Sequence, residues 1–464
     1  MKKQPVIGPM PVIRRQKPSP LRRLVDGRRS ALDVLFERSY SMMMGEFRGL
    51  WRRYYFLNQP EHVSRILDAD VDLYPKSDLM STFLSQILGN GVFVSNGAAW
   101  KRQRKMMNTA FELARVSEAF GQMVKSVESM GERLDQVADG REVAIDMEMS
   151  HVTADIIFRT IFSEPLEREE AETVFRAFNQ YQELAYVHGV WAMAGLPQAL
   201  SLARLRAIRF ARAIRGPLER LVRKRLDLLA TDPAEPPRDI LASLMAARDD
   251  HGKGFTEREL VDQIAVVFLA GHETSASALS WTLYLVARDP DVQARMQAEA
   301  DAVYGGGKSL QMSDFRKLKL TRDAFREGLR LYPPVSFVPR DITVPETIRG
   351  KHLGKGSAVF VPIWLMHRHR QIWKNPDVFD PDRFSRADEK DAIRSAYLPF
   401  SQGPRVCLGA SFAMQEAAII MSYIARRYEM EAIDSRVPQP VSRLTLRSHN
   451  GVWLRLRRRR HDDV

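Results

Sequence analysis

The sequence predicts a mainly α-helical protein with small β-sheets, and three observations carry that prediction. Apolar residues recur at helical spacing over long stretches, namely after Trp100, from Ser117 to Gln136 and from Leu200 to Leu229. Strand-like pieces are short, at 51–57, 341–350, 358–364 and 451–457. One proline-free stretch of about 32 residues is long enough for a single helix of roughly 48 Å, which can cross a whole domain.

That long stretch begins and ends with recognisable helix signals. Thr256 followed by Glu259 is typical of a capping box, and Asp289-Pro290 supplies a stop. Its middle carries "AGHETS", residues Ala270–Ser275. Glycine inside a helix costs about 1 kcal/mol relative to alanine. Either close helix packing or a ligand lying against the backbone explains Gly271, and the segment alone leaves both open.

Composition narrows the class of protein. The 464 residues hold one cysteine, which excludes an internal disulfide and any all-cysteine metal site. Chains beyond roughly 300 residues usually divide into domains. The most linker-like segment, Thr231–Asp239, is short, so a single domain over 1–464 is expected, with an N-terminal extension at 1–20.

Charge and hydropathy favour a cytoplasmic protein without a membrane anchor. The N-terminal residues contain too few consecutive apolar positions for a signal peptide or transmembrane helix. The net charge is +13, and part of it lies in the basic C-terminal segment 455–464, which is expected to be a solvated tail. No zinc-finger, RNP or helix-turn-helix signature is present, so no nucleic-acid partner is expected.

Cys407 is the strongest chemical signal. It stands between Gly403 and Gly409, two residues after Arg405 and just before an amphipathic helix. Glycines allow close approach of the backbone to a flat ligand, and a helix N-terminus with a nearby cation favours a thiolate. A buried inert cysteine is the ordinary alternative, but this setting makes it a poor one. A nucleophilic cysteine needs a histidine nearby, and none is local. The pattern therefore favours a metal-ligating thiolate.

Two further segments indicate a function only when they are considered together. Glu327 and Arg330 stand three residues apart on one helical face, which by itself indicates an ordinary surface ion pair. Arg383 lies in the turn-rich segment Asn375–Phe384 and is positioned to join them.

Together these motifs resemble the cytochrome P-450 family of haem-thiolate monooxygenases, in its soluble bacterial type. The core of the resemblance is Phe400-x-x-Gly403-x-Arg405-x-Cys407-x-Gly409, which is similar to the family's haem-binding signature. Four other motifs follow the family's order and extend the resemblance over nearly the whole chain: Trp100-x-x-x-Arg104, Ala270–Thr274, Glu327-x-x-Arg330 and Pro381–Phe384.

The resemblance implies a single triangular domain with one long central helix, holding haem b with Cys407 as the axial iron ligand. It implies that Thr274 hydrogen-bonds the co-substrate dioxygen, that Glu273 helps to deliver protons, and that Gly271 makes room for dioxygen. It assigns the remaining residues to cofactor binding or to a structural lock: Arg405, Trp100, Arg104, Arg340, Phe400 and Gly409 for haem, and Glu327, Arg330 and Arg383 for the fold.

The resemblance also implies partners. The acid–alcohol pair Glu273-Thr274 favours dioxygen and external electrons over peroxide. No fused redox domain is visible, so NAD(P)H electrons are expected to arrive through a ferredoxin and its reductase. Lys101, Arg102 and Lys105 are candidate contacts for an acidic ferredoxin, with solvated surface charge the equal alternative.

A lipophilic substrate, such as a fatty acid, terpenoid or steroid, is expected to be hydroxylated or epoxidised. The loop Ser77–Val94 is expected to cap its pocket, and Arg443 or Arg447 is a candidate for binding a carboxylate. His367 and His369, spaced as on one strand face, give only a weak metal signal. The expected pocket residues are Ala265, Val266, Leu269, Ala270, Val335, Phe337 and Val338.

Two other functions remain as alternatives. An electron-independent thiolate-haem isomerase or dehydratase disagrees with the acid–alcohol pair. A non-catalytic haem-binding sensor would bind haem and consume no reducing equivalents.

Overall fold

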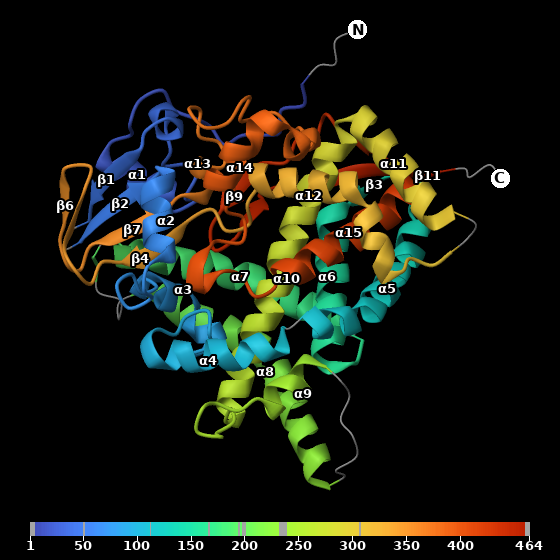
Figure 1. Cartoon of the computed structure of the whole chain (residues 1–464), viewed down its shortest axis with the longest axis horizontal. Coiled ribbons are helices and arrows are strands. Elements are labelled where there is room, and N and C mark those ends of the chain that lie inside the picture. Colours follow the sequence, from blue (N-terminus) through green and yellow to red (C-terminus); the bar gives the residue numbers. More distant parts are fainter. Residues whose placement is uncertain are drawn as a thin grey trace.

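The computed structural model describes residues 5–49, 52–111, 113–165, 168–193, 195–196, 201–231, 239–305 and 308–459. The linker-like residues 232–238 and the last five residues of the basic segment, 460–464, lie outside this description. Figure 1 shows a roughly triangular outline, with sheets and short helices along one broad side and α8 and α9 at the opposite corner.

Helices make up most of the molecule, as the sequence predicts. The helices are α1 Pro20–Gly27, α2 Pro60–Asp68, α3 Asp78–Leu88, α4 Gly97–Ala110, α5 Leu113–Asp135, α6 Ile145–Phe162, α7 Arg168–Met193, α8 Leu202–Thr231, α9 Ile240–Ala246, α10 Glu257–Ala287, α11 Pro290–Tyr304, α12 Lys319–Leu331, α13 Ile363–Met366, α14 Lys390–Ala396 and α15 Ala410–Arg427.

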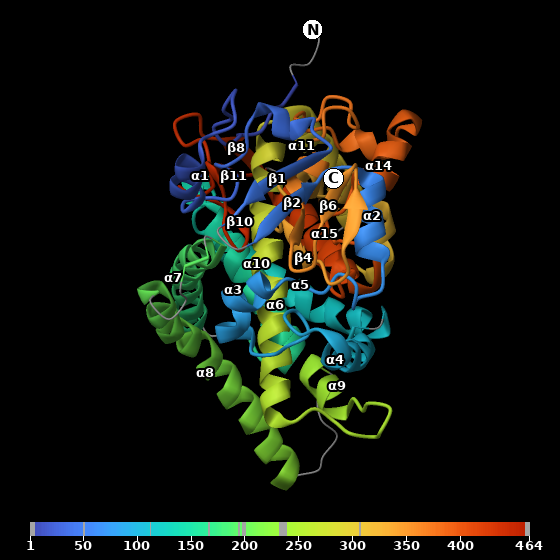
Figure 2. The ribbon, with the colours of Figure 1, turned by 90° about the vertical axis from the view of Figure 1, so that its left-hand side faces the viewer.

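The expected long helix is α10, and it runs through the centre of the molecule in both views (Figures 1 and 2). Its capping box is formed: the Glu259 N–H donates to Thr256 Oγ1 at 3.3 Å, and the Thr256 N–H donates to Glu259 Oε2 at 2.8 Å. All residues from Leu260 to Leu269 are buried. A helix that is apolar on every side lies inside a protein, and α10 does so by packing on α6, α8, α12 and α15.

The strands form small sheets at the edges of the helical body. A four-stranded sheet has the order β1-β2-β7-β4, and a three-stranded sheet has the order β3-β11-β8. The strands are β1 Met44–Arg48, β2 Arg53–Leu57, β3 Asp139–Ala144, β4 Val338–Asp341, β5 Glu346–Ile348, β6 Lys351–Leu353, β7 Ala358–Val361, β8 Tyr428–Ala432, β9 Pro440–Ser442, β10 Leu446–Ser448 and β11 Trp453–Arg458.

Buried apolar side chains of the described residues form one large core and two smaller ones. The large core lies among α5, α6, α10, α12 and α15, where Ile156, Ile264, Leu279 and Ile420 are fully buried. One smaller core lies under the four-stranded sheet, with Leu57 and Val359 at its centre. Burial of this apolar surface is the main stabilising contribution to the fold.

The structure corrects several local expectations. Residues 77–94 are not an extended loop, because α3 occupies most of them. The strand at 358–364 ends at Val361, and Trp364 lies in α13. Residues 455–458 belong to β11, where Arg455 pairs with Glu142 and Glu431, and so they are not a free tail. The N-terminal extension packs on the body, since Tyr332 donates to the Pro9 carbonyl at 2.7 Å.

The group formed by Glu327, Arg330 and Arg383 is completely buried. Glu327 accepts from Arg330 Nε and Nη2 at 2.8 and 2.7 Å, and from Arg383 Nε at 3.2 Å. Arg383 also donates to Glu389 at 2.6 Å, so two guanidiniums face two carboxylates. Further N–H groups of both arginines reach backbone carbonyls, for example that of His367. This network joins α12 to the segment before the Cys407 loop.

Candidate functional site

The Cys407 loop is a tight turn held against α2. Gly403 has φ +70°, and a Cβ there would lie 2.2 Å from the Leu67 carbonyl oxygen, so only glycine fits. The Cys407 N–H donates to the Phe400 carbonyl at 3.0 Å, which closes the turn before α15 begins. Cys407 itself is exposed.

The electrostatics of Cys407 differ in part from the expectation. Although part of the residue is exposed to solvent, the protein atoms packed around the sulfur raise the pKa of the thiol by desolvation, while the Gly409 N–H and the Arg104 guanidinium act in the opposite direction. Arg405 is not the cation that acts on the thiol. Its guanidinium turns toward the carbonyls of Tyr74 and Val71, at 2.9 and 3.0 Å.

Arg104, Arg340, Arg405 and Lys76 gather beside this loop, and we call them the cationic cluster. Arg104 donates to the Val406 carbonyl at 2.8 Å, next to Cys407. Arg340 is buried on β4, and burial together with Arg405 lowers its pKa to about 9. Trp100 lies among them, with the Arg405 guanidinium 5.1 Å from its ring centre. The sequence motifs therefore come together as expected.

Lys76 is the member of this cluster that sequence reasoning missed. Its Nζ donates to the carbonyls of Val92 and Ser95 at 2.6 and 2.8 Å, and it lies 5.5 Å from the Trp100 ring centre. Burial and the three arginines lower its pKa to about 6. Asn96 fixes the position of Lys76 by exchanging two hydrogen bonds with its backbone, at 2.9 and 3.0 Å.

The cationic cluster has no carboxylate partner of its own. Within the described ranges, no ion pair joins any of its four members to an acidic side chain. Buried charges are normally paired, because desolvation of an isolated charge is costly. A site of this kind is complemented by an anion that the protein does not itself supply.

One face of α10 is open opposite this arrangement. Ala270 is exposed although the ten residues before it are buried, and Thr274 is half-buried one turn further on. Val266, Ala270 and Thr274 follow at spacings of four residues and so share a face. The Thr274 hydroxyl donates to the Ala270 carbonyl at 2.6 Å. α10 also packs on α15, the helix that begins directly after the Cys407 loop.

Gly271 lies where α10 packs against α6. A Cβ at this position would lie 3.0 Å from both Cδ1 and Cγ1 of Ile157 on α6. Contact at this distance is tighter than packing normally permits, so glycine allows α10 and α6 to approach closely. This contact agrees with close helix packing, the first of the two explanations that the sequence leaves open, and the role in making room for dioxygen stays a prediction.

Glu273 is buried and points toward the segment around β10. It forms an ion pair with Arg447 and accepts from Thr445 at 2.9 Å. The carboxylate that Arg447 binds is therefore that of Glu273, whereas the sequence analysis considered Arg447 as a contact for a carboxylate of the substrate. Arg443 pairs with Glu183 at 2.6 Å.

The expected pocket residues divide into two groups. On α10, Ala265, Val266 and Leu269 are buried in the larger core, whereas Ala270 is exposed. Val335, Phe337 and Val338 are half-buried on and before β4. Phe337 lies edge-on to Phe56 of β2 with ring centres 6.1 Å apart, so the sheet adds an aromatic wall that the sequence did not indicate.

The three expected ferredoxin contacts are all paired within the chain. Lys101 bonds to Asp72 at 2.7 Å, and Lys105 pairs with Asp250. Arg102 donates to Asp249 and Glu259 at 2.6 and 2.7 Å. These carboxylates offset much of the basic character that the linear sequence suggests.

The histidine pair is not a metal site. His367 and His369 follow α13 in a turn and not in a strand, and His367 Nε2 accepts from the Leu398 N–H at 2.8 Å. No group of three or more histidine, cysteine or acidic side chains suited to a metal occurs within the described ranges. Among the same residues, no helix has both the length and the apolarity needed to cross a membrane.

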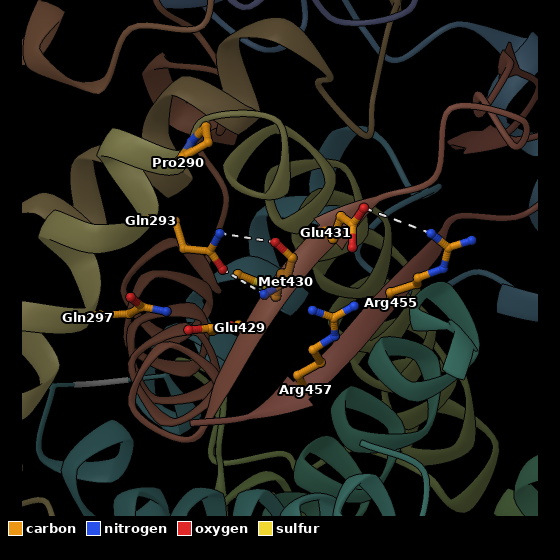
Figure 3. A pocket seen from close by; sticks show the side chains of 8 residues that line it. All are labelled: Pro290, Gln293, Gln297, Glu429, Met430, Glu431, Arg455 and Arg457. Carbon is orange, nitrogen blue, oxygen red and sulfur yellow. Dashed lines mark hydrogen bonds and ion pairs between the residues drawn. The ribbon is translucent and has the colours of Figure 1, made fainter. Parts of the chain in front are cut away.

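A surface groove of about 250 Å³ lies between α11 and the β8–β11 pair (Figure 3). Gln293 exchanges two hydrogen bonds with the Met430 backbone there, at 2.7 and 3.0 Å. The groove contains none of the expected site residues, and its lining is mostly polar.

The residues around Cys407 fit haem, the group that the resemblance implies. Cys407 provides a thiol on a glycine-lined turn, which suits an axial iron ligand. The cationic cluster suits the two carboxylates of the porphyrin, and α10 exposes Ala270 one turn before the half-buried Thr274.

Comparison with known proteins agrees with this fit. A family model described as Cytochrome P450 matches residues 24–454. The chain is 30% identical to Cytochrome P450 4A7 of Oryctolagus cuniculus over 427 residues, covering 89% of this chain and 83% of the relative. It is 32% identical to Cyclooctatin synthase of Streptomyces melanosporofaciens over 396 residues, covering 85% and 84%.

A further relative and a solved structure also match the chain. Taurochenodeoxycholic 6 alpha-hydroxylase of Sus scrofa is 28% identical over 397 residues, with 83% of this chain and 78% of the relative covered. The crystal structure of the cytochrome P450DA heme domain superposes with a TM-score of 0.78 at 23% identity, covering 90% of each chain, which shows a shared fold. The relatives include mammalian and bacterial enzymes, so they do not single out a bacterial type.

Proposed function

Because the chain belongs to the cytochrome P450 family and is a P450 monooxygenase, we propose that it inserts one oxygen atom of dioxygen into an apolar small molecule. The observation that carries this proposal for the chain's own residues is the unpaired cationic cluster beside Cys407. A heme held there by the Cys407 thiolate supplies the dioxygen chemistry.

The chain's own residues have separate tasks in this proposal. Arg104, Arg340, Arg405 and Lys76 would hold the propionates, and Trp100 packs against two of these cations. Thr274 would offer its hydroxyl to dioxygen on the open face of α10. Glu273 is the nearest acid along the helix and would supply protons. The triad Glu327, Arg330 and Arg383 would keep the Cys407 loop in place and would take no part in the chemistry.

The lining supports a lipophilic substrate. Val266, Leu269, Ala270 and Phe337 are apolar, and the nearby arginines 443 and 447 already bind carboxylates of the protein. A fatty acid, terpenoid or steroid-like compound is therefore the proposed class. Reduction by a separate ferredoxin with its NAD(P)H-dependent reductase, in the cytoplasm of a bacterium, completes the proposal.

The first experiment tests the ligand assignment. Replacing Cys407 by alanine should abolish the thiolate-type absorbance of the reduced carbon-monoxide complex, because no other cysteine exists in the chain. Val406→Ala, one residue away and exposed, is the matched control and should keep that spectrum. A thiolate-type spectrum in Cys407→Ala would overturn the assignment.

The second experiment identifies the substrate class. The ferric protein is titrated with fatty acids of several lengths, terpenes, steroids and small aromatic compounds, and the visible spectrum is followed. A low-to-high-spin shift with one class, followed by oxidised product with a ferredoxin system, supports the proposal. Binding without consumption of reducing equivalents would favour a sensor.

A further inference from the structure

Helix α8 carries much of the positive charge of the chain. Its 30 residues hold eight arginines and one lysine, and Glu219 and Asp227 are its only acidic residues. Its formal charge is therefore +7, against +13 for all 464 residues. None of the motifs around Cys407 involves this helix, so its charge needs a separate explanation.

The basic residues of α8 fall into a paired and an unpaired group. Four of them form ion pairs with acidic side chains: Arg215 with Asp262, Arg223 with Glu257, Lys224 with Glu164 and Arg225 with Asp239. Arg206, Arg209 and Arg212 are exposed near the start of the helix. Within the described part of the chain, none of these three forms an ion pair or a side-chain hydrogen bond. Their charge is therefore available to a partner.

The three unpaired arginines share one face of α8 with two exposed leucines. Leu202 is 68% exposed and Leu205 is 60% exposed. The five positions follow the spacing i, i+3, i+4, i+7 and i+10, which places them on one side of the helix over roughly 15 Å. The opposite side is buried through Ala207, Ala211 and Ile214. We call this exposed side the α8 arginine face; it consists of Leu202, Leu205, Arg206, Arg209 and Arg212.

The helix that bears this face packs on the elements proposed to enclose the substrate. α8 contacts α3, α7 and α10, and α3 occupies most of the segment expected to cap the pocket. Figure 2 shows α8 along the outer flank of the molecule, next to α7. A partner bound to the α8 arginine face would therefore lie beside helices that cover α10.

The composition of the α8 arginine face favours an acidic protein as its partner. Arginine beside apolar side chains is typical of protein interfaces, in which arginine is enriched and lysine is depleted. An anionic membrane would extend along the helix and would also repel Glu219 and Asp227, which are exposed further along it. A face of roughly 15 Å suits a small and transient contact.

We propose that the α8 arginine face docks a small acidic carrier protein, and that the lipophilic substrate reaches the enzyme as an acyl group attached to this carrier. This inference rests on the proposed function and narrows its substrate class to carrier-bound fatty acyl groups. A free lipophilic compound enters an apolar pocket without help from surface charge. A substrate attached to an acidic protein gains from a cationic surface near the pocket, because the charge steers association and fixes the orientation of the complex.

A binding measurement with acyl carrier protein tests this docking without turnover. The probe is the carrier protein with its phosphopantetheine arm, first without an acyl group and then with a palmitoyl group. In calorimetric titrations of the heme-loaded enzyme, the triple variant Arg206→Gln, Arg209→Gln and Arg212→Gln should bind both forms about tenfold or more weakly, because charge-assisted contacts are lost. Added salt should weaken the wild-type complex and have little effect on that of the variant.

The matched control removes three charges elsewhere on the surface and so has the same net charge. It combines Arg223→Gln, Arg295→Gln and Arg394→Gln, whose arginines pair with Glu257, Asp382 and Asp391. This control should bind the carrier as the wild type does. Both triple variants should keep the wild-type Tm, since exposed charges contribute little to stability. Equal weakening in both triple variants would overturn the proposal, because net charge alone would then explain the binding.

A spectroscopic titration tests the delivery of substrate. The palmitoyl carrier should produce the low-to-high-spin shift at several-fold lower concentration than free palmitic acid, and the α8 triple variant should lose this advantage. Equal concentrations for the two forms in the wild type would overturn the delivery by a carrier.

Two other outcomes decide between partners. A wild-type enzyme that does not bind the carrier protein would overturn the proposal. If it binds vesicles containing phosphatidylglycerol instead, and the α8 triple variant does not, the face contacts a membrane. If the heme-loaded enzyme with its reductants oxidises no compound, free or carrier-bound, the proposed function fails, while the calorimetric titrations still decide whether the face docks a carrier.

Discussion

Two clusters of charged side chains in this molecule differ in one respect, and the difference separates structure from function. The triad Glu327, Arg330 and Arg383, completed by Glu389, balances its charges and forms hydrogen bonds throughout. The cationic cluster near Cys407 gathers Lys76, Arg104, Arg340 and Arg405 without an acidic partner in the described part of the chain. A balanced group is complete within the protein, whereas an unbalanced one is complete only with a ligand.

The largest expected effect comes from breaking the balanced group. Arg330→Ala leaves Glu327 buried without its closest cation, so the free energy of unfolding should fall by about 3–5 kcal/mol. Denaturant unfolding of the purified variant measures this loss. The control is Arg394→Ala, which removes an ion pair with Asp391 between two well-exposed side chains and should cause no measurable change. A stable Arg330→Ala would contradict the structural role of the triad.

Removing a cation from the unbalanced group should weaken heme binding without lowering the stability of the heme-free protein. Arg405→Met relieves repulsion among buried cations, so the stability of the heme-free protein should stay equal or rise. Transfer of heme to an acceptor protein should become roughly tenfold or more faster, because a charge-assisted hydrogen bond to a carboxylate is lost. Arg102→Met is the control, since Arg102 is paired within the chain. Unfolding of Arg405→Met comparable to that of Arg330→Ala would contradict the comparison.

A third effect is a pH dependence of stability that is present only without heme. In the heme-free protein the folded state holds Lys76 with a pKa of about 6, below its unfolded value, so the folded state binds fewer protons above pH 6 and stability rises with pH. Lys76→Met lacks this dependence. Its Tm should exceed that of the wild type most below pH 6, and the gain should decline toward pH 10.

The same Tm comparison in the heme-loaded protein tests whether Lys76 meets the propionates. Carboxylates beside Lys76 favour its charged form, so the Tm advantage of Lys76→Met should disappear in the loaded protein. An advantage that persists unchanged after loading would show that Lys76 does not meet the propionates.

The sequence predicted the features that local pattern controls. The capping box at Thr256, the stop at Asp289-Pro290 and the helix after Cys407 all depend on neighbours a few residues away, and the structure contains them. The meeting of Arg104 and Arg405 with Trp100 was expected from the order of known motifs rather than from any physical signal in the chain.

The remaining features depend on partners that are distant in sequence. Lys76 joins the cationic cluster through Asn96 and a bridge to Arg340, and nothing near Lys76 in sequence marks it. Glu273 finds Arg447 only when the C-terminal hairpin folds onto α10 and α7. The histidine spacing at 367 and 369 suggested a strand, but burial of Trp364 beneath Tyr40 and Arg368 continues α13 into a turn instead.

The three-stranded sheet has a consequence for biosynthesis. β11 lies between β3 and β8, and its register joins residues 453–458 to residues 139–144. During synthesis β3 therefore has no strand to pair with until β11 has been made. The helices between the two strands lack the contacts of this sheet until then. Because non-local pairing is slow and leaves edges exposed, newly made chains should depend on chaperones until the final strand emerges. Premature termination shortly before residue 453 would release a nearly full-length polypeptide that is directed to degradation.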